Sequence, residues 1–158
     1  MTAYRQRRVG LISDTHGLLR PEAVEALRGS EFIVHAGDIG AAAILERLSA
    51  IAPVTAVRGN NDAGPWAAAL NDVEVLRIDE AVICVVHDLA KLDIDAAAAG
   101  FHAVVSGHSH RPTIRDRDGV LYANPGSAGP RRFSLPVSVG SLVVAGARVQ
   151  ARLLTLDI

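Results

Sequence analysis

The stretch RRVGLISDTHGLLRPEAVEALRG, residues 7–29, carries the pattern that decides the fold. It predicts a buried strand, a polar loop, and a helix that Pro21 opens and Gly29 closes. Residues 31–50 repeat the plan with a second strand, the loop DIG and a second helix, and residues 53–59 predict a third strand. This alternation of strands and helices is typical of a parallel sheet with helical crossovers.

The sequence of the second half of the chain predicts mostly antiparallel strands. Two strands joined by the short turn DE precede a helix-like alanine-rich stretch at 92–100, and a DG turn and Gly146 mark two further hairpins. The predicted strands lie within 72–78, 81–87, 101–108, 112–127 and 137–158. The chain therefore predicts an α/β fold in one domain over 1–158, with two mixed β-sheets packed face to face and helices on the outside. That arrangement is a four-layer α/β/β/α sandwich.

Composition excludes several classes of protein. Hydrophobic residues make up 49% and charged residues 21% of the 158, with a net charge of -1, which is typical of a globular domain and argues against a large polyanionic partner. The apolar stretch after the N-terminal arginines is too short for a signal peptide, and the longest apolar run, 81–86, is too short to cross a membrane. We therefore expect a cytoplasmic protein, whose single Cys84 is a buried apolar side chain.

Polar residues follow five predicted strands, at the point where each strand ends. Ligands of such sheets bind beyond the carboxyl ends of the strands. Two histidines one residue apart on an extended segment point the same way, so His108 and His110 are expected to face one spot. The set of oxygen and imidazole donors is too large for one tetrahedral zinc and fits two metals that share a carboxylate. Its members are Asp14, His16, Asp38, Asn60, His87, His108 and His110.

Each of these fragments taken singly has an ordinary interpretation. Asp, Asn and Gly after a strand usually serve the turn itself. His16 alone could cap the following helix, and His87 alone could be a buried, hydrogen-bonded histidine. The order and the strand-end placement of all seven residues together favour the metal site.

The motifs DTH, GD, GNND, His87 and GHSH, in this order, resemble those of the calcineurin-like metallophosphoesterase superfamily. More narrowly, the chain looks like the small single-domain phosphodiesterases of bacteria and archaea, in which an NPGS segment, here 124–127, follows the last histidine pair. The resemblance spans residues 9 to 132 and implies two divalent metals at the strand ends. It assigns Asp14, His16, Asp38 and His110 to the first metal and Asp38, Asn60, His87 and His108 to the second. Asp38 would bridge the two metals.

The resemblance implies a metal-dependent phosphoric ester hydrolase, with a phosphodiesterase favoured over a monoesterase. A hydroxide bridging the two metals would attack the phosphorus of a small phosphate ester. Two divalent ions, less two carboxylates and one hydroxide, leave about one positive charge for the incoming anion. Manganese is the favoured metal, and iron, nickel, cobalt and zinc also suit mixed oxygen and nitrogen donors.

Several residues depart from, or add to, the family pattern. Asn61 stands where many larger members have a histidine that protonates the leaving oxygen, and an amide cannot donate an acidic proton. We therefore expect a preference for good leaving groups. Asp88 follows His87 where glycine is usual and is interpreted as a turn residue. Asp62 is expected to fix His87 or its loop without binding metal, and His35 to be packed and hydrogen-bonded.

The partners follow from the same features. A small phosphate ester is the expected substrate, and Arg111, Arg131 or Arg132 could clamp its phosphate, although a solvated arginine is the commoner case. Near-neutral charge and 4% aromatic residues argue against extended nucleic acid. The C-terminal hairpin could supply an edge for a homo-oligomer. The main alternative is a metal-binding scaffold of the same fold with weak or no turnover.

Overall fold

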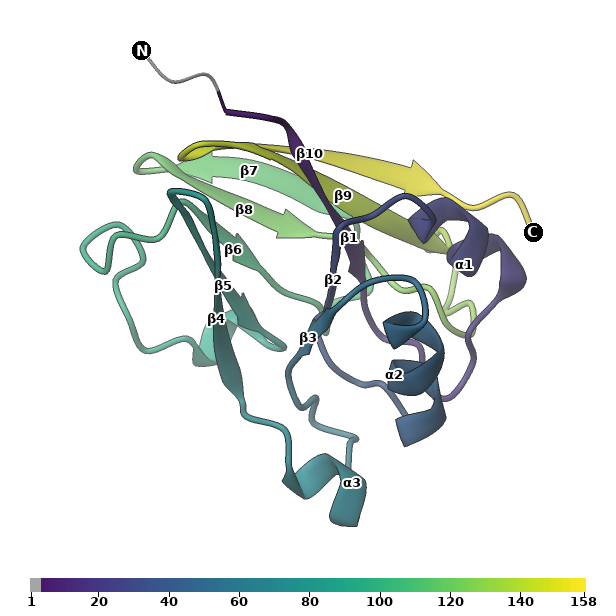
Figure 1. Cartoon of the computed structure of the whole chain (residues 1–158). Coiled ribbons are helices and arrows are strands. Elements are labelled where there is room, and N and C mark those ends of the chain that lie inside the picture. The colour runs from purple at the N-terminus through teal and green to yellow at the C-terminus, as the bar shows by residue number, and fades with distance from the viewer. Residues whose placement is uncertain (1–3) are drawn as a thin grey trace.

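The computed structural model describes residues 4–158 and contains two five-stranded β-sheets (Figure 1). The strand order is β10-β9-β1-β2-β3 in the first sheet and β4-β5-β6-β8-β7 in the second. In chain order the elements are β1 (Arg7–Ile12), α1 (Pro21–Leu27), β2 (Phe32–His35), α2 (Ala42–Ser49), β3 (Val54–Ala56), α3 (Pro65–Ala68), β4 (Val73–Ile78), β5 (Ala81–Val86), the 3-10 helix η1 (Leu89–Lys91), β6 (Ala103–Val105), β7 (Thr113–Arg117), β8 (Val120–Asn124), β9 (Ser138–Ala145) and β10 (Arg148–Thr155).

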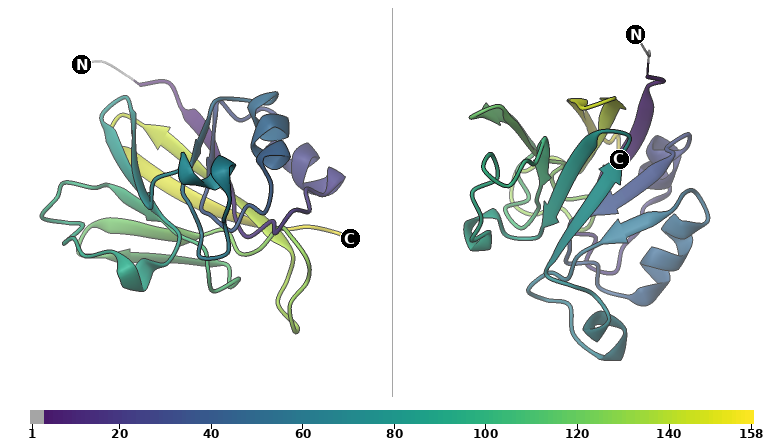
Figure 2. Two further views of the ribbon diagram at one scale, coloured as in Figure 1. Left: turned by 90° about the horizontal axis from the view of Figure 1, so that it is seen from below. Right: turned by 60° about the vertical axis from the view of Figure 1, so that its left-hand side comes forward.

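The first sheet follows the predicted alternation of strands and helices. β1, β2 and β3 pair in parallel, and the crossover helices α1 and α2 lie together on the outer face of this sheet (Figure 2). The predicted C-terminal hairpin about Gly146 is confirmed as β9 and β10. This hairpin extends the first sheet, because β9 pairs antiparallel with β1. Both parallel and antiparallel pairs therefore occur in the first sheet, as expected.

The second sheet is also mixed. β4 with β5 and β7 with β8 form antiparallel hairpins, the second of them around the predicted turn of Asp118 and Gly119. β6, however, pairs in parallel with both β5 and β8. The second half of the chain is thus less antiparallel than its sequence suggests. As a result, β5, β6 and β8 direct their carboxyl ends to one edge of the sheet.

A continuous apolar core fills the space between the two sheets. Val9 and Leu11 of β1 share this core with Ile83 and Val85 of β5, and all four side chains are fully buried. Cys84 lies on the opposite face of β5 and is buried there, as predicted. Burial of one such side chain contributes roughly 1.5–3 kcal/mol, so this core fixes how the two sheets sit against each other.

The outer faces of the two sheets are covered differently. Leu27 of α1 and Leu48 of α2 are buried against the first sheet. On the second sheet, the cover consists of residues 89–101, which pack Ala96 and Phe101 onto the strands. The α/β sandwich is confirmed, with a turn-rich segment and the 3-10 helix η1 as its fourth layer. No helix within residues 4–158 is long and apolar enough to cross a membrane.

The helix predicted over 92–100 is wrong. This stretch forms consecutive turns after η1. The carboxylates of Asp88 and Asp95 accept hydrogen bonds from the backbone N–H groups of Ala90 and Ala98, at 3.1 and 3.2 Å. Both are capping bonds that start a helical turn. The turn after Asp95 ends at once, because Gly100 has a left-handed φ of 81° and the Phe101 N–H closes the turn by donating to the Ala96 carbonyl at 3.1 Å.

Candidate metal centre

The structure brings all seven candidate ligands together at one edge of the sandwich. They lie in the loops that follow β1, β2, β3, β5 and β6. Backbone bonds extend the sheets into these loops, since the Asp14 N–H donates to the Gly37 carbonyl at 3.0 Å and the Gly107 N–H to the His87 carbonyl at 2.9 Å. The His108 N–H donates to Oδ2 of Asp14 at 3.1 Å and joins the two sheets at this point.

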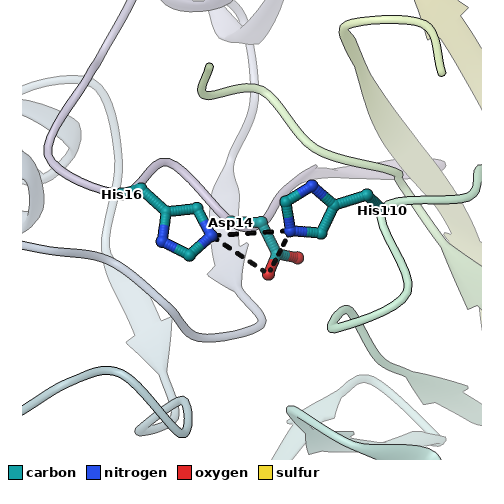
Figure 3. A group of neighbouring side chains, drawn as sticks. All are labelled: Asp14, His16 and His110. Atoms are coloured by element: carbon teal, nitrogen blue, oxygen red, sulfur yellow. Dashed lines mark hydrogen bonds and ion pairs between the residues drawn. The ribbon is translucent and has the colours of Figure 1, made fainter. Parts of the chain in front are cut away.

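Three of these side chains form a first cluster around Asp14 (Figure 3). One ligand atom each from Asp14, His16 and His110 lies within 4.8 Å of the others. The Nε2 atoms of His16 and His110 are 3.9 and 3.3 Å from Oδ1 of Asp14 and 3.5 Å from each other. Donor atoms at this spacing suit one cation, whose bonds to nitrogen and oxygen are about 2.0–2.2 Å long for zinc.

The second cluster is built around Asp38. Its Oδ2 lies 3.4 Å from Nε2 of His87 and 3.8 Å from Nε2 of His16. Oδ1 of Asn60 lies 2.9 Å from Nε2 of His87 and 3.2 Å from Nδ1 of His108. One carboxylate oxygen of Asp38 therefore faces donors of both clusters.

The hydrogen bonding of Asp14 tests whether these residues fit a cation. Oδ2 accepts from the Ser13 hydroxyl at 2.7 Å and from the His108 N–H. Oδ1 is buried and accepts no hydrogen bond, although it faces the imidazoles of His16, His87 and His110. A buried carboxylate oxygen without a partner is costly. A cation between Oδ1 and the imidazole lone pairs satisfies both, so the residues fit a metal.

The backbone is strained at the same place. Among residues 4–158, eight non-glycine residues have a positive φ, and five of them are candidate ligands: Asp14, His16, Asp38, His108 and His110. This conformation costs on the order of 1–3 kcal/mol per residue and concentrates at ligand-binding sites. Two more, Asp79 and Asp118, lie in hairpin turns, and the eighth is Phe133.

The extended geometry predicted for the GHSH segment is wrong. β6 ends at Val105, and His108 and His110 have φ of 70° and 61°. Their side chains consequently diverge. His110 is buried in the first cluster, whereas His108 is exposed and joins the second through Asn60.

Asp62 holds the loops that carry Asp38 and Asn60. Its carboxylate accepts hydrogen bonds from the backbone N–H groups of Ile39, Gly40 and Gly59, at 3.2, 3.0 and 2.9 Å. The two loops approach so closely that a Cβ on Gly59 would overlap the backbone nitrogen of Asp38. Asp62 therefore fixes the loop, which is one of the two roles predicted for it.

Replacing Asp62 with alanine should lower the free energy of unfolding by about 3 kcal/mol or more, because hydrogen bonds to a charged group contribute about 1.5–3 kcal/mol each. Urea denaturation of the metal-free protein measures the effect. Asp72 provides the matched control, since its side chain is 74% exposed and forms a surface ion pair with Arg58. Asp72→Ala should cost no more than about 1 kcal/mol. Similar losses for both variants would contradict the assignment.

Sequence reasoning missed the role of two residues that position the carboxylates. The backbone N–H and Nδ2 of Asn61 donate to Oδ1 and Oδ2 of Asp38, at 2.8 and 2.9 Å. Ser13 plays the same part for Asp14. Each adjoins a candidate ligand in the sequence, but that position alone does not reveal which carboxylate a side chain will meet. Their effect is to fix the orientation of both carboxyl groups.

Hydrogen bonds also set the charge at His87 and Asp38. Burial works to lower the pKa of His87, but its bonds to Asp38 and to the Ala36 carbonyl, at 2.7 Å for the latter, raise the pKa above its usual value. Burial works to raise the pKa of Asp38, but hydrogen bonds from His87 and Asn61 lower it well below the usual range. Nδ1 of His87 donates to the carbonyl, which leaves Nε2 as the ligand atom.

His35 lies beneath the site and outside both clusters. Its Nδ1 accepts from the Gly37 N–H at 3.1 Å, and its Nε2 donates to the Thr15 hydroxyl at 3.0 Å. That hydroxyl donates in turn to the Ile39 carbonyl at 2.8 Å. Complete burial, followed by the influence of His87, lowers the pKa of His35 to about 3, so the ring is neutral. The prediction of a packed, hydrogen-bonded histidine is confirmed.

Two pockets flank the site on either side of Asp88. One, of about 360 Å³, includes Asn60 and His87 in its lining, and the other, of about 300 Å³, includes His108 and Arg111. Asp88 caps η1 as the predicted turn residue, and its Oδ2 also lies 3.8 Å from Nε2 of His108. Arg111, Arg131 and Arg132 are exposed, and phosphate binding by any of them stays a prediction.

Comparisons with known proteins agree with this fold. Residues 8–146 match the family model of the calcineurin-like phosphoesterase superfamily domain. A probable metallophosphoesterase of Methanothermobacter thermautotrophicus is 33% identical over 92% of this chain and 91% of its own length. Among solved structures, vacuolar protein sorting 29 of Cryptosporidium parvum superposes with a TM-score of 0.81 at 21% identity, covering 96% of this chain and 92% of that one. An archaeal phosphodiesterase superposes with a TM-score of 0.76 at 23% identity, covering 93% and 99%.

Proposed function

Because the chain belongs to the calcineurin-like phosphoesterase superfamily, a family of metal-dependent phosphoric ester hydrolases, we propose that it is a phosphodiesterase that uses two divalent ions. The observation that carries the proposal is the position of Asp38, whose Oδ2 lies 3.8 Å from His16 and 3.4 Å from His87. One carboxylate between two clusters is the arrangement that a pair of ions requires.

The proposal assigns the ligands as follows: Asp14, His16, Asp38 and His110 hold the first ion, and Asp38, Asn60, His87 and His108 hold the second. When bound, the ions supply the charge that polarises the phosphoryl group and activates a water molecule as the nucleophile. Ser13 and Asn61 keep the two carboxylates in fixed orientations. The Ala36 carbonyl holds the His87 ring with Nε2 toward the site.

The ligand set selects an anionic substrate. Two carboxylates face four imidazoles and one amide, so two divalent ions keep a net positive charge after binding. The two pockets beside Asp88 offer room for two substituents on one phosphorus, which supports a diester. A solved neighbour of the same fold is itself described as an archaeal phosphodiesterase.

Asn61 leads to a prediction about the leaving group. Its Nδ2 is bonded to Asp38, and an amide cannot supply an acidic proton to the departing oxygen. General acid catalysis contributes typically about 10²–10⁴-fold. We therefore expect kcat/KM for bis(p-nitrophenyl) phosphate to exceed that for alkyl diesters by about 10³-fold or more, after the difference in Kd between the two substrates has been divided out. Equal chemistry-limited rates for the two classes would contradict this, and Asn61→His should narrow the gap.

Turnover of activated diesters by the manganese-loaded protein tests the function itself. Metal analysis and a panel of mono- and diesters, each assayed across a range of pH, give the preference directly. A protein that binds two ions but leaves every activated ester intact would favour the scaffold alternative. The manganese, the single domain over 1–158, the cytoplasmic location, the small-ester substrate and a homo-oligomer stay predictions of the sequence.

A further inference from the structure

Phe133 is the one non-glycine residue with a positive φ in 4–158 that is neither a candidate ligand nor a hairpin-turn residue. Its φ is 54° and its side chain is 89% exposed. A left-handed backbone is an outlier for so bulky a side chain, and an exposed phenyl ring forgoes the stabilisation of burial. Outside turns, strain of this kind clusters at active sites and ligand clamps.

Residues 128–136 form a loop, here called the aromatic arm, which carries Phe133. A bridge between Ser127 and Val137 closes the base of this loop, and the Ser138 N–H donates to the Ser127 carbonyl at 2.9 Å. The Ser127 hydroxyl donates to the carbonyl of Asp14 at 3.0 Å. The aromatic arm thus starts and ends beside the first cluster, and it projects from the body as the yellow-green loop in Figure 2, left.

Its first residues are held tightly against the loop that carries the ligands. The Ala128 N–H donates to the Ser13 carbonyl at 3.0 Å. A Cβ on Gly129 would overlap the carbonyl oxygens of both Asp14 and Thr15. No side chain fits there, so Gly129 is required for this approach. The base of the aromatic arm therefore has a defined position relative to the candidate metal ligands.

The aromatic arm also carries a positive charge. Arg132 is exposed, and its carbonyl accepts from the Leu135 N–H at 3.1 Å in a turn that presents Phe133. Arg132 adjoins Phe133 on the aromatic arm, and the base of the arm is bonded to the loop that carries Asp14. An arginine beside a phosphate site suits a bidentate contact.

We infer that the aromatic arm binds the substrate, with the Phe133 ring stacked on a planar group of the phosphate ester, such as a nucleobase, and Arg132 directed at the phosphate. The inference rests on the proposed function and deepens it, because it names nucleoside phosphate esters as the substrate class. One exposed ring offers one stacking position, which suits a single nucleotide and leaves the argument against extended nucleic acid intact.

Equilibrium binding to the manganese-loaded full chain tests this inference without requiring turnover. Adenosine 5′-monophosphate, the product that such a diester would release, is compared with inorganic phosphate by calorimetry. We expect the wild type to bind the nucleotide about tenfold or more tightly than phosphate, since stacking on one aromatic side chain contributes about 5- to 150-fold. Phe133→Ala should abolish most of that difference, Phe133→Trp should keep it, and Arg132→Ala should weaken both ligands.

Leu154→Ala is the matched control, because this side chain is 51% exposed and apolar on β10; it should change neither affinity. The inference would be overturned if Phe133→Ala left nucleotide binding unchanged, or if it weakened the nucleotide and phosphate equally. It would also be overturned if sedimentation velocity showed that Phe133→Ala dissociates an oligomer. Bis(p-nitrophenyl) phosphate separates the two proposals. If the wild type binds the nucleotide through Phe133 but never cleaves this ester, the proposed phosphodiesterase activity is refuted and the proposed binding role of the aromatic arm is upheld.

Discussion

Asp38→Asn is expected to lower kcat/KM for an activated phosphodiester by about 10³-fold or more, well beyond the roughly 10–100-fold typical of residues that only support a ligand. The substitution keeps the size of the side chain and removes the charge that two ions would share. It also opposes the local hydrogen bonding, because Asn61 donates to both oxygens of Asp38 and an amide offers only one acceptor. The new NH₂ group would face a hydrogen-bond donor of Asn61, and two donors cannot bond to each other.

Metal analysis of the same variant separates a lost ligand from a lost fold. Two ions per chain in the wild type should fall to one or fewer. Without metal, the variant should be less stable than the wild type by roughly 1–3 kcal/mol but still folded, because the amide loses one of the two hydrogen bonds from Asn61 that stabilise the carboxylate. Asp72→Asn, at an exposed acid, should leave activity and metal content unchanged. A variant that keeps two ions and a tenth of its activity would refute the bridging role of Asp38.

Removal of the metal with a chelator should abolish activity and lower the melting temperature by about 5–10 °C. The shift follows from mass action, because a ligand at about 100 times its Kd stabilises the folded state by about 2.7 kcal/mol, and each kcal/mol corresponds to about 2–4 °C for a chain of this size. Asp14 explains why the folded state gains so much, since Oδ1 is buried and accepts no hydrogen bond. Differential scanning calorimetry with and without Mn²⁺ measures the shift.

The rise in melting temperature on metal binding should depend on pH and on the candidate metal ligands. His87 has a raised pKa in the metal-free protein, and its Nε2 must lose the proton before it binds metal, so the melting shift should shrink as the pH falls through the pKa of His87. Asp38→Asn should lose most of the shift, and Asp72→Asn should keep it. A shift of the same size in both variants would show that the metal binds elsewhere.

Sequence patterns predicted the elements wherever a local rule operated. Pro21 and Gly29 bound α1, the DG turn is where β7 meets β8, and Gly146 lies in the last hairpin. Two local expectations failed for physical reasons. The alanines of 92–100 form a single turn that Gly100 ends, and the strand geometry extrapolated to the GHSH segment stopped at Val105.

The site shows the same division. The ordered motifs pointed to seven candidate donors that the structure brings to one edge, because the carboxyl ends of successive parallel strands meet there. The contacts of Asn61 and Ser13 with the two carboxylates escaped, since each depends on a loop whose position follows from packing. The aromatic arm escaped for the same reason, because its base is held by bonds to the loop after β1, such as the bond from Ser127 to Asp14, which lies 113 residues earlier in the chain.

By itself, then, the amino-acid sequence determined which donors this protein has, their order and the strands that present them, because periodicity and turn residues act over a few neighbouring positions. Only the tertiary structure decided that Oδ2 of Asp38 faces both clusters, that Oδ1 of Asp14 lacks a partner and that the arm carrying the exposed Phe133 is anchored at Asp14. Those facts depend on how two sheets pack across one apolar core, and packing joins residues that the chain keeps far apart.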